Sequence, residues 1–231
     1  MDLSEPKPEW GGPWTERKLE AFAKYVRSYL TIMNRNRYWK TIYFDGFAGS
    51  GSRKQKESDL HHQLSIAPEE EKLYRGSAER VLQLPNPLVF DYYYFIDTNE
   101  SSLKKLKKHL TEMPEALNKK LEFRPGNANE ALNQLAGALR QIKPSYAALV
   151  FLDPFGMQID WSSIAALKET RTDVWILIPT GVIINRLLDR KGELKNLKKL
   201  ESFFGLTEEE IRKRILPDRN HSHSLWRRNQ S

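Results

Sequence analysis

The sequence predicts an α/β protein built on a doubly wound, mostly parallel sheet. Short apolar segments alternate with amphipathic helical segments, and repeated β-α-β units of this kind form parallel sheets with helices on both faces. Polar residues follow these apolar segments, at the strand ends where such sheets bind ligands. A glycine-rich stretch, "FDGFAGSG", comes directly after the first predicted strand. A chain of 231 residues can hold one such domain, with or without appendages.

The spacing of apolar residues places each helix and strand. In the first helix, Leu19, Phe22 and Val26 share one face, and Thr15 is the expected N-cap. The predicted strands are 41–44, 92–96, 121–124, 147–152 and 174–178. The predicted helices are 15–33, 77–84, 99–110, 129–142, 162–169, 182–188, 193–204 and 207–216, the last with a capping box from Thr207 to Glu210.

Three regions organise the chain. Residues 1–40 are expected to form an N-terminal helical extension, residues 41–180 the sheet-containing domain, and residues 181–231 a C-terminal helical segment and tail. Within the domain, residues 52–75 carry mixed charge with little periodicity, which predicts a long loop insertion. We find no strand pattern after the fifth strand.

Composition excludes several classes of protein. The chain has no cysteine, which rules out disulfides, thiolate metal sites and cysteine nucleophiles and favours a cytoplasmic location. It has neither a long apolar run nor an apolar N-terminal segment, so we expect no membrane span and no secretory signal. Its histidines have no second ligand cluster, so no metal site is predicted. The net charge of +7 suits an anionic partner such as nucleic acid, although many basic proteins are simply soluble.

The glycine turn indicates the kind of ligand. Asp45 precedes Gly46, Gly49 and Gly51, and this spacing matches neither G-x-G-x-x-G nor the phosphate loop. A nicotinamide-dependent dehydrogenase is therefore disfavoured. A carboxylate at this point would repel a phosphate and attract a cation. Asp97, at the end of the second strand, could accept both hydroxyls of a ribose. S-adenosylmethionine, with a cationic end and an adenosine end, fits both residues.

Four motifs in order resemble class I S-adenosylmethionine-dependent methyltransferases. They are "FDGFAGSG", "FIDTNESSLKKL", "PGNANEAL" and "VFLDPFG". The wider set "DGFAGSG … GSA … FID … FLDPFG … INRLL" resembles the three-Cys-motif partner protein family, TcmP, over roughly residues 14–205. This resemblance implies a Rossmann-like methyltransferase domain. It also implies pairing with a separate protein that carries the cysteine motif.

The resemblance also implies roles for individual residues. The methionine side of the cofactor would be lined by Asp45, Gly46, Phe47, Ala48, Gly49 and Gly51. Asp97 would hold the ribose, and Asn127 would lie beside the adenine. The transferred methyl group would be faced by Asp153, Pro154, Phe155 and Gly156, and the first three of these are the candidate catalytic residues.

The chain departs from the family pattern in two places. A typical domain of this class ends in an antiparallel strand pair, which we do not find, so a truncated or spliced form is expected. Asp-Pro-Phe-Gly stands where methyltransferases of base amino groups have Asp/Asn-Pro-Pro-Tyr/Phe, which disfavours that reaction. Cytosine C5 methylation by the usual route is excluded, because it needs a cysteine nucleophile.

Each site residue also has a structural alternative. Asp45 could form a strand-to-helix corner, Asp97 could cap the next helix, and Asp153 could form a turn before Pro154. Phe155 could belong to the core. Two functional hypotheses follow. The first is a methyltransferase acting on nucleic acid or a nucleic-acid-linked molecule. The second is a catalytically inactive protein of the same fold that binds another protein or RNA.

Overall fold

The computed structural model describes residues 13–36, 38–50, 76–142, 145–178 and 196–215. These residues form a five-stranded sheet in the order β3-β2-β1-β4-β5, and every neighbouring pair is parallel. The strands are β1 (Lys40–Asp45), β2 (Tyr92–Asp97), β3 (Leu121–Pro125), β4 (Tyr146–Leu152) and β5 (Thr172–Ile176). This is the strand order of a doubly wound, Rossmann-like sheet, so the predicted fold class is confirmed.

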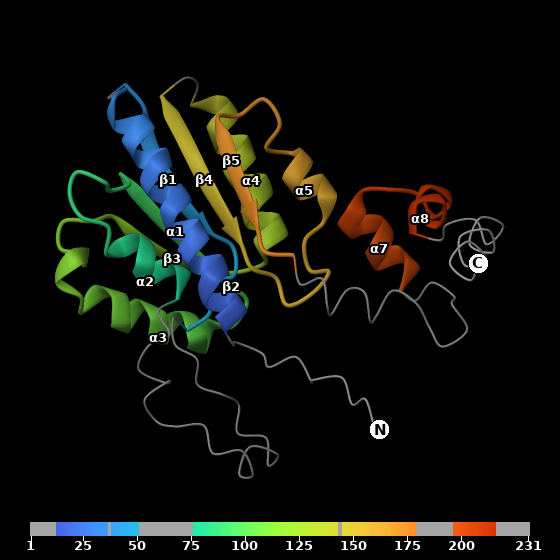
Figure 1. The fold of residues 1–231 in the computed structure, drawn as a ribbon, viewed down its shortest axis with the longest axis horizontal. Helices are drawn as coiled ribbons and strands as arrows, with labels where there is room; N and C mark the ends of the chain where they lie inside the picture. The colour runs from blue at the N-terminus through green and yellow to red at the C-terminus, as the bar shows by residue number, and fades with distance from the viewer. Residues whose placement is uncertain (1–12, 37, 51–75, 143–144, 179–195, 216–231) are drawn as a thin grey trace, which may run out of the picture.

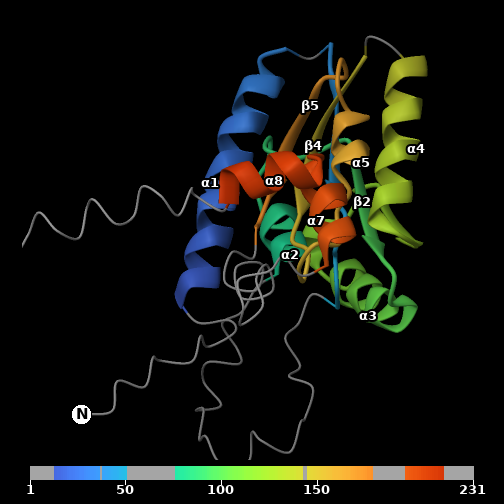
Figure 2. The same ribbon diagram turned by 90° about the vertical axis from the view of Figure 1, so that its right-hand side faces the viewer.

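Helices cover both faces of this sheet (Figures 1 and 2). They are α1 (Pro13–Asn34), α2 (Ser77–Leu82), α3 (Glu100–Thr111), α4 (Ala128–Gln141), α5 (Trp161–Ala165), α7 (Leu197–Phe204) and α8 (Glu208–Ile215), with a short 3₁₀ helix, η2 (Pro114–Ala116). Figure 2 shows α1 and α4 on opposite sides of the sheet. No helix in the described ranges is both long and apolar enough to cross a membrane.

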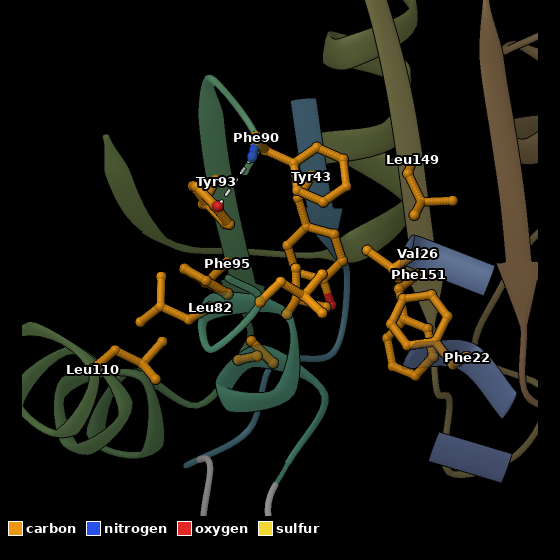
Figure 3. Close-up of a cluster of buried hydrophobic side chains, with 14 of the residues drawn as sticks. Phe22, Val26, Tyr43, Leu82, Phe90, Tyr93, Phe95, Leu110, Leu149 and Phe151 are labelled. Atoms are coloured by element: carbon orange, nitrogen blue, oxygen red, sulfur yellow. Dashed lines mark hydrogen bonds between the residues drawn. The ribbon is translucent and has the colours of Figure 1, made fainter. Parts of the chain in front are cut away.

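The largest core cluster lies between the sheet and helices α1, α2 and α3 (Figure 3). Alternate residues of each strand point to this face, as the period of two requires. Tyr43 of β1 and Phe151 of β4 are buried there against Phe22 of α1. At the amino end of β5, the Tyr25 hydroxyl of α1 donates to Asp173 at 2.6 Å. Helix α1 therefore packs directly on the sheet, as one of the helices that cover this face.

The opposite face of the sheet packs against α4 and α5. Phe44, Ile96 and Val150 form this second cluster with Leu132 and Ala136 of α4. The alternation between the two faces is what the apolar runs "TIYF" and "AALVFL" predict for strands that are buried on both sides.

Element boundaries differ from the sequence prediction at several places, including α2, which ends at 82 instead of 84, and α7, which begins at 197 instead of 193. Helix α1 begins at Pro13, so Thr15 lies inside the helix and the predicted N-cap is wrong. Proline suits the first turn of a helix because its φ is already helical and its missing N–H is not needed there. Strand β5 is 172–176 instead of 174–178, because its register with β4 ends where Leu152 pairs with Ile176. Helix α5 ends at Ala165, short of the predicted 169.

Several predicted segments lie outside the described residues. They are the loop 52–75, the helix 182–188 and the tail beyond 215. Among the described residues that follow β5, helices are present and no strand is.

Helices α7 and α8 form a small cluster of their own beside α5. The capping box is confirmed, since the Thr207 N–H donates to Glu210 Oε2 at 2.8 Å and the Glu210 N–H donates to Thr207 Oγ1 at 3.4 Å. The Ser202 hydroxyl of α7 donates to Asp160 Oδ1 at 2.5 Å, just before α5. Gly205 ends α7 with a φ of 63° and lies against the Trp161 side chain.

Replacing Gly205 with alanine should destabilise the docking of α7 on α5. A Cβ at this position would lie 2.2 Å from Trp161 Cδ1, and the positive φ adds strain for any L-residue. We expect a loss of about 1–3 kcal/mol in the free energy of unfolding. Chemical denaturation would measure it, with Gly137→Ala as the control, because a Cβ at Gly137 of α4 meets nothing within 4 Å. Equal losses in both variants would contradict the prediction.

Candidate functional site at the carboxyl ends of the strands

Asp45 is the last residue of β1 and its side chain is fully buried. Three groups donate to its carboxylate: the Ser77 hydroxyl at 2.8 Å, the Tyr43 hydroxyl at 3.1 Å and the Phe47 N–H at 3.2 Å. Burial raises the pKa of Asp45 from 3.8 to about 6 despite these donors, and the nearby charge of Asp153 adds to the rise. In this arrangement the Asp45 carboxylate fixes the start of the glycine turn through the Phe47 N–H. It also places a negative charge next to the turn.

The glycine turn is fastened to the neighbouring strands by its backbone. The Gly46 N–H donates to the Phe151 carbonyl of β4, and the Ala48 N–H donates to the Ile96 carbonyl of β2, each at 3.0 Å. A Cβ on Gly46 would lie 2.6 Å from Leu152 Cδ2, so this glycine serves close packing. Gly49 has a φ of 60°, which favours glycine. Gly51 lies outside the described residues.

Asp97 ends β2 and is linked directly to the glycine turn. Its Oδ2 accepts from the Gly49 N–H at 2.8 Å, and its Oδ1 accepts from the Asn99 N–H at 2.7 Å. The alternative that Asp97 caps α3 is wrong, because Asn99 is the N-cap and accepts from the Ser102 N–H. Each oxygen of the half-buried Asp97 carboxylate keeps a second lone pair for a ligand hydroxyl.

Asn127 follows β3 and caps α4. Its Oδ1 accepts from the Asn129 N–H at 2.8 Å, and the residue itself is exposed. The amide N–H₂ and the second lone pair of Oδ1 are the groups that an adenine edge could meet. The structure therefore gives Asn127 a structural role that is compatible with the predicted one.

Asp153, Pro154 and Phe155 follow β4. Pro154 is buried, whereas Phe155 is 76% exposed, so the alternative that Phe155 belongs to the core is wrong. The Phe155 N–H donates to Gln158 Oε1 at 2.8 Å, and Gly156 has a φ of 145°, so this loop has a defined turn. An exposed aromatic ring on a fixed loop at the carboxyl edge of the sheet can stack on a planar substrate.

Sequence reasoning missed three residues that hold the site together. Ser77 and Tyr43 donate to Asp45. Asn129 bridges α4 to the loop after β4, because its Nδ2 donates to the Gln158 carbonyl at 2.9 Å and its Oδ1 accepts from the Asp160 N–H at 2.9 Å. One signal was available for Asn129, since asparagine in the first turn of a helix often bonds to neighbouring backbone.

These residues meet at the point where the strand order reverses. From β1 the chain builds outward to β2 and β3, then crosses back to β4 on the other side of β1. Asp45 at the end of β1 and Asp153 just after β4 flank this switch point. Open α/β sheets bind their ligands in the crevice outside such a point. Two carboxylates there favour a ligand with a cationic group.

Comparison with known proteins gives only distant likenesses. No family model matches the chain, and no curated protein does. Protein LPL1258 from Legionella pneumophila, of the DUF519 family model, is 19% identical with a TM-score of 0.39 over 60% of this chain, which spans 55% of that protein. The candidate methylase HI0767 from Haemophilus influenzae is 18% identical (TM-score 0.37, 68% of this chain, 69% of that one). The candidate methyltransferase YhhF from Escherichia coli is 17% identical (TM-score 0.30, 74% and 67%).

These likenesses are too distant to carry functional detail, so we infer function from the chain's own residues. Membership of the three-Cys-motif partner family stays a prediction from the motifs.

Proposed function

We propose that this chain is an S-adenosylmethionine-dependent methyltransferase whose substrate is nucleic acid or a nucleic-acid-linked molecule. One observation carries the proposal: the glycine turn after β1 is hydrogen-bonded to the carboxylate that ends β2, at the switch point of the sheet. A turn that serves only as a corner does not need the Gly49 N–H to fix a half-buried aspartate on the next strand. The net charge of +7 supports an anionic substrate.

The residues present fit this cofactor. Asp97 would accept the ribose hydroxyls, and its orientation is already fixed by the Gly49 and Asn99 N–H groups. Asn127 would meet the adenine edge. The buried Asp45 would hold the turn and supply negative potential opposite a cationic group, since the electric field of a buried carboxylate is weakly screened.

When bound, S-adenosylmethionine supplies an electrophilic methyl group. The chain's own task is then to position and orient the acceptor. Asp153 would accept a hydrogen bond from the acceptor's N–H or O–H and so fix the direction of its lone pair. Phe155 would stack on a planar acceptor, which its 76% exposure allows.

Calorimetric titration with S-adenosylhomocysteine tests the proposal. The parent chain should bind saturably, and Asp97→Ala should weaken binding at least tenfold, because the ribose hydroxyls lose a charged acceptor. Asp173→Ala is the matched control, since Asp173 is an exposed aspartate at the amino end of β5 and should leave binding unchanged. Asp153→Ala should keep binding and lose transfer of a labelled methyl group. A folded parent chain that does not bind would sink the cofactor assignment and favour the inactive partner protein.

Pairing with a cysteine-motif protein forms a second, separate part of the proposal. It is supported by the motif resemblance alone. Co-purification of the tagged chain with such a protein would test it.

A further inference from the structure

A groove opens on the α4 face of the sheet, away from the glycine turn. It encloses about 460 Å³. Its floor is formed by Ile42 and Phe44 of β1 with Tyr92 and Tyr94 of β2, the strand residues that point away from the α1 side. Helix α4 forms one wall. The other wall is β3, which is the outermost strand of the described sheet.

The groove is distinct from the strand-end site. Among the candidate cofactor and catalytic residues, Asn127 alone lines it, at the carboxyl end. From there the groove runs along β2 to Tyr146, the first residue of β4. Asp45, Asp97 and Asp153 do not line it. The groove and the strand-end site therefore share Asn127 alone among these residues.

Tyrosine rings line this groove, and two cations lie over them. The Lys120 ammonium lies 4.7 Å from the centre of the Tyr92 ring, and the Arg124 guanidinium lies 5.2 Å from the centre of the Tyr94 ring. Arg124 of β3 lines the groove, and Lys120 lies just before that strand. The Tyr92 and Tyr146 rings are 6.1 Å apart. Single-stranded bases stack on tyrosines of a sheet face, and cations that lie over such rings can turn to the phosphates of the same strand.

The helical wall supplies polar groups for the edge of a base. Glu130 and Gln134 of α4 line the groove and are four residues apart, so they lie on one face of the helix. A carboxylate accepts from an exocyclic amino group, and an amide both donates and accepts, so the pair can recognise a base edge. A volume of 460 Å³ is in the range of small-molecule sites and can hold a nucleotide unit.

We propose that this groove binds a base of single-stranded nucleic acid, stacked on Tyr92 or Tyr94, with the adjoining phosphates on Lys120 and Arg124. The observations favour a polymer over a free nucleotide, because the cations follow the open edge of the sheet and the whole chain carries a net charge of +7. The groove thus adds a nucleic-acid binding site that does not depend on methyl transfer.

Fluorescence anisotropy with a labelled 12-nucleotide single-stranded RNA would test the groove. Tyr94→Leu removes a stacking ring but keeps apolar bulk, and we expect it to weaken binding about tenfold or more. Arg124→Gln removes one of the two cations. Ala138→Trp places a bulky ring over the groove from an exposed position of α4. The matched controls are Tyr38→Leu and Lys105→Gln, both exposed and away from the groove. Circular dichroism and S-adenosylhomocysteine binding would report separately on folding and on the strand-end site.

Loss of RNA binding in the three groove variants, with the controls unchanged, supports the proposal. Unchanged binding in Ala138→Trp and Arg124→Gln overturns it, and so does an equal loss in Tyr38→Leu. Equal competition by polyglutamate would show that charge alone drives binding, and would also overturn it. Competition by a free mononucleotide at the same nucleotide concentration would overturn the polymer assignment.

Discussion

Replacing Asp45 with asparagine is expected to raise the free energy of unfolding at pH 7 by up to about 3 kcal/mol. The native carboxyl is fully buried and its pKa is raised from 3.8 to about 6. A pKa difference of one between the folded and unfolded states corresponds to about 1.4 kcal/mol, and the rise at Asp45 therefore gives this figure. Asparagine fills the same space without charge. It can keep the acceptor for the Phe47 N–H and donate to the Ser77 or Tyr43 hydroxyl, which can accept after rotation.

The pH profile gives the sign of this effect. Between about pH 4 and pH 6 the native state keeps the Asp45 proton and the unfolded state has lost it, so the native state binds more protons. Asp45 therefore lowers stability as pH rises through this window, and the cost is complete above the native pKa. Exposed groups with lowered pKa values, such as Glu100 and Glu210, act in the opposite direction. The difference between the parent and Asp45→Asn profiles isolates the Asp45 contribution.

Urea denaturation at pH 4, 5, 6 and 7 would measure both profiles. The two curves should nearly coincide at pH 4 and separate as pH rises, with the asparagine variant the more stable. Asp97→Asn is the control at the same edge of the sheet. It should bring no gain, because the half-buried Asp97 carboxylate accepts a backbone N–H on each oxygen and asparagine would lose one acceptor. Curves that stay parallel from pH 4 to pH 7 would contradict the prediction.

A buried carboxylate that costs stability points to a function for its charge. The chain would be more stable with a neutral residue at position 45, yet the aspartate lies behind the turn where the proposed cationic ligand would bind. Active sites often show such a trade-off between stability and activity. We therefore expect Asp45→Asn to weaken S-adenosylhomocysteine binding while it stabilises the fold.

The strands, and the aspartates that follow them, were predictable from the sequence because apolar runs and the residues next to them are a local signal. Runs such as "AALVFL" are apolar at every position, which indicates strands buried on both faces, and Asp45, Asp97 and Asp153 follow such runs directly. The boundaries were less predictable. Strand β5 ends where its register with β4 ends, and no property of residues 172–178 alone encodes that pairing.

The parts of the site that sequence did not reveal depend on contacts between distant residues. Ser77 reaches Asp45 across 32 positions, and Asn129 reaches the Asp160 N–H across 31. The raised pKa of Asp45 likewise comes from packing that buries it completely. The groove on the α4 face could not be predicted for a related reason. Tyr92 and Tyr94 appear in the sequence only as part of the apolar strand "YYYFI". Which face of a strand a helix leaves uncovered is set by the tertiary fold.

Replacing Phe22 with alanine is expected to cost about 3–5 kcal/mol in the free energy of unfolding. Phe22 of α1 is fully buried, and its ring lies 4.2 Å from that of Phe151 and 5.7 Å from that of Trp175, centre to centre. These two neighbours come from β4 and β5, and their backbone is fixed by the sheet, so they cannot collapse into the space. A cavity would remain beside the strand whose Phe151 carbonyl accepts the Gly46 N–H.

Phe155→Ala is the matched control for this variant. Its ring is 76% exposed on the loop after β4, so its removal should change stability by no more than about 0.5 kcal/mol. Urea denaturation of both variants separates the two phenylalanines by role, because Phe22 should affect folding and Phe155 should affect transfer to a planar acceptor. A loss below about 1 kcal/mol for Phe22→Ala would mean that α1 contributes little to the packed core. A large loss in the free energy of unfolding would show that the packing of α1 stabilises β4. The glycine turn, which is hydrogen-bonded to β4, would then depend on α1 as well.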